Sequence, residues 1–146
     1  MVKVFGLGSV VVAMLAAGCT GQDTLATTAL PRPDTAPGRL LSFSGTLQPQ
    51  GIKSYSFGVT TAGEVEVTLL GAALVGVEPA QSVTLGLGIG TASAYGSCLL
   101  THSVNAQGGP RAQLTGTGQE GTLCVSIFDV GTLTGPANFS LTVATP

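Results

Sequence analysis

Apolar and polar residues alternate with a period of two over most of the chain from residue 39 onward. This period is typical of β-strands, because successive side chains of a strand point to opposite faces of the sheet. The gaps between the alternating segments contain Gly, Pro or Asn, which favour turns, and no segment carries an amphipathic helical pattern with caps. The predicted strands are residues 41–47, 55–59, 65–69, 83–90, 98–104, 122–130 and 139–143.

This pattern predicts an all-β domain over residues 39–146, with about seven or eight antiparallel strands. Such strands bury one face against a second sheet or close into a barrel, and we expect an antiparallel β-sandwich. Its core is expected to consist mostly of Val, Leu and Ile, because the whole chain has no Trp, two Tyr and five Phe.

One predicted strand has an unusual second face. Within residues 83–90, glycine occupies every second position, at Gly86, Gly88 and Gly90. Glycine brings no side chain to a solvent-facing surface, so the pattern indicates either a strongly bent strand or another backbone or a ligand that approaches closely. Strand glycines mostly mark bulges and bends, and we therefore expect a bend.

The chain begins with an uncharged apolar segment at residues 4–17. This segment is too short to span a bilayer of about 30 Å, but it suits the apolar region of a signal peptide. It ends in Leu-Ala-Ala-Gly-Cys at residues 15–19, which resembles the lipobox of bacterial lipoproteins. The resemblance implies that residues 1–18 are a signal peptide and that Cys19 becomes the acylated first residue. The alternative is an ordinary secretory signal that leaves Cys19 as a free thiol.

A lipidated Cys19 predicts a membrane as one partner, held through the lipid anchor, because two or more acyl chains anchor a protein stably. The protein is then expected in the cell envelope, facing the periplasm or the exterior. Under the sorting rule of lipoproteins in enteric-type bacteria, Thr20 in place of an aspartate after Cys19 implies the outer membrane if the cell has two membranes. Residues 19–38 mix Thr, Ala and Pro without a hydrophobic period, which predicts an extended linker between the anchor and the domain at 39–146.

The other two cysteines, Cys98 and Cys124, form an even pair if Cys19 carries lipid. Disulfides persist in oxidising compartments, and a bridge between these two residues would stabilise the domain by about 3.5 kcal/mol in the chain-entropy model. Two cysteines and a single histidine do not supply four zinc ligands at the usual spacing. We therefore predict a Cys98–Cys124 disulfide and no metal site.

Three segments resemble the bacterial pre-peptidase C-terminal (PPC) domain. They are Lys-Ser-Tyr-Ser-Phe at 53–57 with the glycine turn and strand at 61–65, Gly-Thr-Leu-Cys-Val-Ser-Ile-Phe-Asp at 121–129, and Asn-Phe-Ser-Leu-Thr-Val at 138–143. The similarity covers roughly residues 43–144. It implies a small jelly-roll-like β-sandwich with an accessory role, such as binding, secretion or targeting, and nothing catalytic.

The low content of charged residues excludes several classes of function. Charged residues make up 8% of the chain, against about 25% in an average soluble domain. Five Lys and Arg against seven Asp and Glu provide no basic face for nucleic acid. The composition also excludes a disordered charged tail and a coiled coil.

Candidate catalytic residues are few, and we expect no enzyme activity. His102 is the only histidine, so any Ser-His or Cys-His mechanism must use it, and no G-x-S-x-G motif is present. Glu64 and Glu66 share one face of a predicted strand, which we place on the exposed side of a hairpin. Residues 116–121 match G-x-G-x-x-G, but a strand follows them instead of a helix, so we predict a hairpin turn and no dinucleotide site.

No cofactor is expected, and one weak calcium site remains an open alternative. Glu120 and Asp129 could supply oxygen ligands together with backbone carbonyls, as calcium prefers. A turn role for Asp129 beside Gly131 is the simpler interpretation.

Together these features predict a membrane-anchored lipoprotein with a non-catalytic binding or structural role at the cell envelope, with an envelope protein or a glycan as the partner. One alternative is a carbohydrate-binding module, for which Tyr95 is the candidate exposed aromatic. Another is a scaffold that adds a strand to a protein partner at an open sheet edge. The sequence identifies no ligand.

Overall fold

The computed structural model describes residues 38–146, so the predicted signal peptide, Cys19 and nearly all of the predicted linker lie outside the described residues. The described part contains eight β-strands and no helix, and it therefore has no helix of the length and hydropathy needed to span a membrane. The strands are β1 (Leu40–Leu47), β2 (Ile52–Val59), β3 (Gly63–Leu74), β4 (Leu85–Ala92), β5 (Cys98–Ala106), β6 (Leu114–Gly118), β7 (Gly121–Asp129) and β8 (Ala137–Ala144).

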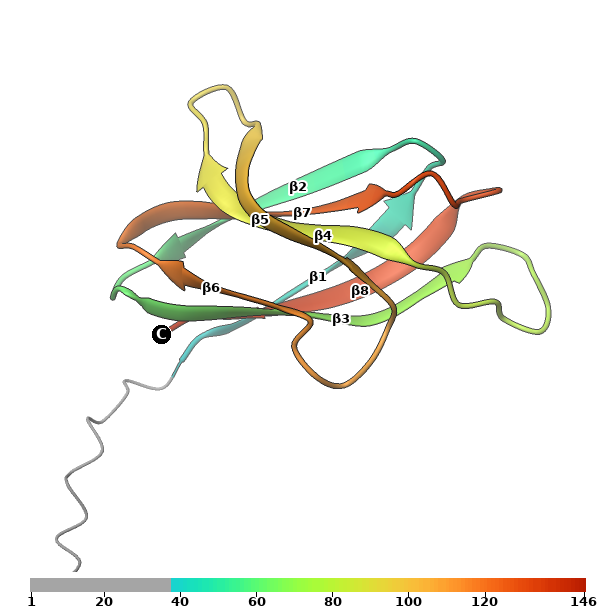
Figure 1. Ribbon diagram of the computed structural model, residues 1–146, viewed down its shortest axis with the longest axis horizontal. Helices are drawn as coiled ribbons and strands as arrows, with labels where there is room; N and C mark the ends of the chain where they lie inside the picture. Colours follow the sequence, from blue (N-terminus) through green and yellow to red (C-terminus); the bar gives the residue numbers. More distant parts are fainter. Residues whose placement is uncertain (1–37) are drawn as a thin grey trace, which may run out of the picture. The chain divides into compact units, whose positions relative to one another are not determined.

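The strands form two four-stranded antiparallel sheets that stack face to face (Figure 1). Sheet A has the order β1-β8-β3-β6, and sheet B has the order β2-β7-β4-β5. The chain crosses from one sheet to the other at every connection except β4–β5, which is a hairpin within sheet B. The predicted all-β antiparallel sandwich is confirmed.

The core lies between the two sheets and is mostly aliphatic, as the composition predicts. Every second residue of each central strand points inward and is almost completely buried, and only a few aromatic rings join them. The largest fully buried apolar side chains are Leu47, Val65, Val67, Leu69, Leu85, Leu87, Val125, Ile127, Leu141 and Val143.

Each of the seven predicted strands overlaps an observed one, and the eighth, β6, was not predicted. The hairpin turn predicted at residues 116–121 is wrong, because β6 pairs with β3 in sheet A while β7 belongs to sheet B. Gln119 and Glu120 therefore connect the two sheets. Glycines at 116 and 118 leave the inward face of β6 almost without side chains, which hides the strand from a hydrophobic pattern. Gly118 packs tightly there, since a Cβ atom would lie 2.8 Å from Val65.

Candidate functional site

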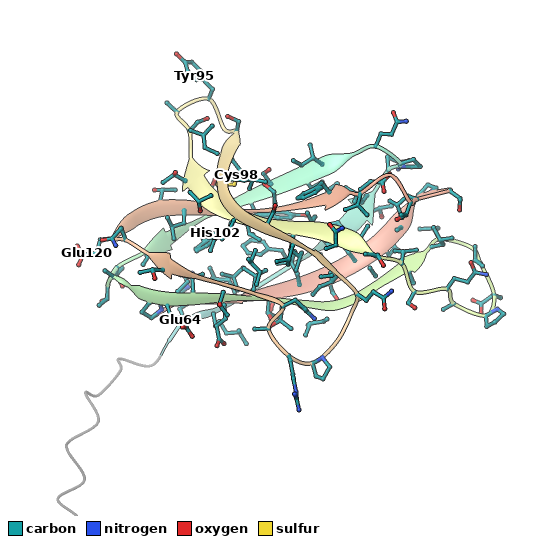
Figure 2. All side chains as sticks on the ribbon, viewed as in Figure 1. Glu64, Tyr95, Cys98, His102 and Glu120 are labelled. Carbon is teal, nitrogen blue, oxygen red and sulfur yellow. A yellow bond between two sulfur atoms is a disulfide. The ribbon has the colours of Figure 1, made fainter. Side chains whose placement is uncertain are left out.

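The β4–β5 hairpin projects from the sandwich and carries the most exposed aromatic side chain of the described residues. Tyr95, at its tip, is 97% exposed, and its ring points away from the body of the domain (Figure 2). Serine, alanine and glycine surround it in the sequence Ser-Ala-Tyr-Gly-Ser at 93–97. This confirms the expectation that Tyr95 is exposed, and it makes the hairpin the first candidate for a contact surface.

The hairpin tip is held in one conformation by local hydrogen bonds. The Ser93 amide donates to the Ser97 carbonyl oxygen at 2.8 Å, and the Gly96 amide donates to the Ser93 carbonyl oxygen at 3.1 Å. The Ser93 hydroxyl oxygen accepts from the amides of Tyr95 and Ser97 at 3.3 and 3.1 Å. Gly96 has φ of +78°, a left-handed conformation that glycine adopts without strain. Tyr95 is therefore displayed on an ordered turn.

The base of the hairpin is fixed by the predicted disulfide, which is confirmed. Cys98, the first residue of β5, is bonded to Cys124 in the middle of β7, with a Cα–Cα distance of 5.7 Å. Cys124 is buried, although it lies on the outer face of sheet B. The bond thus joins the start of β5 to a strand that is not its neighbour in the sheet, and it holds the hairpin over this outer face.

The alternate glycines of β4 explain how neighbouring groups, above all the backbone of β5, lie so close to this strand. A Cβ atom at Gly90 would lie 1.9 Å from the Leu99 carbonyl oxygen, so a backbone occupies the space that a side chain would need. A Cβ at Gly86 would overlap the Phe128 ring, and one at Gly88 would lie 2.7 Å from Leu100. The β4–β5 register shifts between Ile89 and Gly90, where Thr101 is an extra residue on β5, whereas the register of β4 with β7 is unbroken. The glycines of β4 therefore make room for side chains and for the backbone of β5, which is the close approach that the glycine pattern indicated as the alternative to a bend.

The outer face of sheet B is uncharged around the hairpin. The sequence has no Asp, Glu, Lys or Arg between Glu78 and Arg111. The residues that share this face by register are Ile52, Ser54, Ser56, Gly86, Gly88, Gly90, Leu100, Ser103, Asn105, Cys124, Ser126 and Phe128. Glu64 and Glu66, in contrast, are exposed on sheet A. Their exposure agrees with the prediction, but the predicted hairpin at this place is wrong, since β2 and β3 lie in different sheets.

His102 lies on β5 over the body of the domain, whereas Tyr95 is at the projecting tip (Figure 2). Its Nδ1 atom is 3.2 Å from the Thr101 hydroxyl oxygen. That hydroxyl donates to the Ile89 carbonyl oxygen at 3.1 Å, so Nδ1 is the donor toward Thr101. The Thr101 hydroxyl is therefore hydrogen-bonded to a backbone carbonyl as well as lying beside the imidazole.

A small hollow of about 190 Å³ lies between the edges of the two sheets beside His102. This volume is less than the ~300 Å³ at which ligand pockets usually begin. None of its lining residues carries a carboxylate. The lining consists of Ile89, Gly90, Thr91, Thr101, His102, Gly116, Thr117, Gln119 and Leu123.

Asp129 has a structural role that the sequence only suggested. Its Oδ1 atom accepts from the amides of Gly131, Thr132 and Leu133 at 2.9 to 3.2 Å, and its Oδ2 atom accepts from the Gln50 amide at 2.8 Å. The Gln50 hydrogen bond, followed by the others, lowers the pKa of Asp129 below its ordinary value of 3.8. The carboxylate thereby joins the β1–β2 turn to the loop after β7.

Glu120 and Asp129 do not form the calcium site that the sequence left open. Glu120 precedes β7 and Asp129 ends it, and a strand rises by about 3.3 Å per residue, so the two carboxylates lie some 30 Å apart. Both oxygens of Asp129 already accept backbone hydrogen bonds. Within residues 38–146, no group of three or more His, Cys, Asp or Glu side chains is arranged to hold a metal ion.

The chain matches no known protein-family model. No curated protein is significantly similar to it. The resemblances to bacterial lipoproteins and to the PPC domain therefore stay predictions.

Proposed function

We propose that this chain is a lipid-anchored protein of the cell envelope and that its β-sandwich is a non-catalytic binding domain. The β4–β5 hairpin is its contact element, and an envelope protein is its partner. Cys19 would carry the anchor, residues 19–38 would give the domain reach, and the anchor would lie in the outer membrane if the cell has two. The single observation that carries the binding role is the display of Tyr95 at the tip of the hairpin.

Three properties of the hairpin support a contact role. First, a tyrosine offers a large contact area at a low cost in conformational entropy, and Ser and Gly beside it provide adaptable hydrogen bonding, a composition that antibody loops also use. Second, the turn and the Cys98–Cys124 bond order the element before it meets a partner, which lowers the entropic cost of binding. Third, the hairpin carries no charge that contact would have to desolvate.

The arrangement around His102 supports a non-catalytic role. The Thr101 hydroxyl proton is directed at the Ile89 carbonyl oxygen, and the adjacent hollow is small and has no carboxylate in its lining. General acid–base and nucleophilic mechanisms need a positioned base next to a nucleophile or a pair of carboxylates in a cleft.

A glycan partner is the second candidate, and Tyr95 is the observation that favours it. Carbohydrate modules usually stack several aromatics on sugar rings. The other described aromatics all rest against the domain: Phe57 and Phe139 are buried, the half-buried rings of Phe43 and Tyr55 stack on each other with centroids 4.7 Å apart, and the Phe128 ring covers Gly86. A single tyrosine is a small stacking surface, so we favour a protein partner.

A photo-crosslinking amino acid at position 95 tests this proposal in intact cells. We expect a covalent adduct with an envelope protein from position 95 and none from the same amino acid at position 64, on the opposite sheet. Excess domain with intact Tyr95 should suppress the adduct, and excess Tyr95→Ala domain should not. Equal adducts from both positions, or none from position 95, contradict the contact role. Retention of the purified protein on an insoluble glycan, lost in Tyr95→Ala, would instead establish the glycan alternative.

A further inference from the structure

β1 is the one edge strand of the described sheets without a feature that prevents pairing with another chain. Edge strands are usually protected by charges, prolines, bulges or shortness. β2 carries the charge of Lys53, β5 contains a bulge, and β6 has only five residues. β1 has eight residues, Leu-Leu-Ser-Phe-Ser-Gly-Thr-Leu, with no charge and no proline, and its register with β8 is unbroken.

Within residues 38–146, no strand pairs with the backbone hydrogen-bonding groups on the free side of β1. The Arg39 carbonyl oxygen accepts from the Thr145 amide at 2.9 Å, so Arg39 faces the neighbouring end of β8. The backbone N–H and C=O groups of successive residues point to opposite sides of an antiparallel strand. Every second residue from Leu40 onward therefore directs these groups away from β8, to the free side of β1. The Ser44 carbonyl oxygen agrees with this direction, since the Tyr55 hydroxyl of sheet B donates to it at 3.3 Å. The outward-facing residues are Leu40, Ser42, Ser44 and Thr46.

Apolar surface accompanies this free edge. Leu40 is 65% exposed. On the inner face, Leu41, Phe43 and Tyr55 pack against the core but are only partly buried. The stacked rings of Phe43 and Tyr55 therefore come to the surface where the edges of β1 and β2 meet. A strand added to β1 would cover these side chains as well as the backbone groups.

The sequence of β1 is complementary to itself in an antiparallel register centred on Phe43. Ser42 then lies opposite Ser44 of the second copy, Leu40 opposite Thr46, and Phe43 opposite Phe43. The outward-facing backbone groups pair with each other, the Ser44 carbonyl oxygen accepting from Ser42 of the second copy through its second lone pair beside the Tyr55 hydroxyl. No charge of β1 is buried. The two Phe43 residues form a non-hydrogen-bonded pair, where cross-strand side chains approach most closely.

We propose that two copies of this chain associate through β1, which joins their A sheets into one continuous antiparallel sheet with two-fold symmetry. A two-fold interface uses the same patch on both copies, as this register requires. The self-complementary register favours a second copy over a foreign peptide, which would need side-chain pockets for its recognition. The pairing uses neither the hairpin nor the lipid anchor, and its test is therefore independent of both.

Sedimentation velocity of the full chain in a non-ionic detergent, over a range of protein concentrations, tests the pairing. Ser42→Pro removes an outward N–H that no strand within residues 38–146 uses, and edge strands tolerate proline at such a position. Ser56→Pro is the matched control, because the backbone N–H of Ser56 also points away from its sheet, on the edge strand β2. The Gly51 carbonyl oxygen, just before β2, accepts from the Asp129 amide of β7, so the backbone groups of every second residue from Ile52 to Gly58 point the other way. Ser44→Lys is a second variant that keeps the backbone donor and adds a charge to the edge.

We expect a dimer whose fraction rises with the concentration of the native protein and of Ser56→Pro. Dimerisation should weaken at least tenfold in Ser42→Pro and in Ser44→Lys, with unchanged β-sheet circular dichroism. A native protein that stays monomeric throughout overturns the proposal, as does a Ser44→Lys variant that dimerises as the native protein does. If Ser42→Pro fails to fold, Ser44→Lys alone decides the outcome.

Discussion

Replacing Gly90 by alanine tests how closely the Leu99 backbone of β5 approaches β4. The new Cβ atom would lie 1.9 Å from the Leu99 carbonyl oxygen and 2.6 Å from its carbonyl carbon. Favourable contacts between non-bonded carbons begin near 3.5 Å, so one of the two backbones must move by about 1 Å. The next residue before Leu99 is Cys98, which the disulfide holds to β7. The disulfide therefore restricts the movement of the Leu99 backbone that would relieve the clash.

The expected cost follows from comparable substitutions. Overpacking usually destabilises by about 1–3 kcal/mol, and we place Gly90→Ala at about 3 kcal/mol because the clash is with a backbone. With an unfolding entropy of about 2.1 cal/mol/K per residue over roughly 110 residues, this corresponds to a fall in Tm of about 13 °C. Gly88→Ala meets only the end of the Leu100 side chain, which can change rotamer, and it should cost about 1 kcal/mol.

Gly58→Ala is the matched control, because Gly58 also lies within a strand of sheet B and a Cβ there would meet nothing within 4 Å. It should be neutral or stabilise by up to about 1 kcal/mol, since alanine restricts the unfolded chain. Thermal and urea unfolding of the disulfide-intact proteins measure all three variants. If Gly90→Ala unfolds within 1 kcal/mol of Gly58→Ala, the close approach of the Leu99 backbone to β4 is refuted.

Three further predictions concern the disulfide, Asp129 and Tyr95. Replacing both Cys98 and Cys124 by alanine should destabilise the domain by about 3.5 kcal/mol in urea unfolding, and an unchanged stability would contradict a bond that restrains the hairpin. Because the folded-state pKa of Asp129 is lowered, its stabilising contribution is complete above the ordinary value of 3.8 and is lost as pH falls through the folded pKa. The stability difference between the native protein and Asp129→Asn should therefore shrink from pH 7 to pH 3; a constant difference contradicts the assignment. Tyr95→Ser should leave the Tm within about 2 °C, because a side chain that is 97% exposed contributes little packing, and a larger loss would give Tyr95 a structural role.

The strands could largely be predicted from the sequence, because period-two alternation reports burial on one face directly. Val65, Val67 and Leu69 are predicted and observed in the core. The disulfide could be predicted because two cysteines remain once Cys19 is set aside. β6 escaped prediction because Gly116 and Gly118 face inward and leave almost no hydrophobic signal.

The arrangement of the site depends on long-range packing that local patterns do not contain. The alternate glycines of β4 predicted a bend or a close approach, and only the structure shows that the Leu99 backbone and the Phe128 ring fill the space. The separation of Glu120 from Asp129 follows from β7 being one continuous strand between them. The free edge of β1 could not be predicted either, because the position of a strand within its sheet depends on the strand order.

The intact mass of the protein extracted from its native membrane tests both the lipid anchor and the Cys98–Cys124 disulfide. The sample is measured before and after reduction with alkylation. We expect the mass of residues 19–146 plus acyl chains, with two alkylatable thiols that appear only after reduction. An unacylated mass would contradict the lipid anchor, and free thiols at Cys98 and Cys124 before reduction would contradict the disulfide.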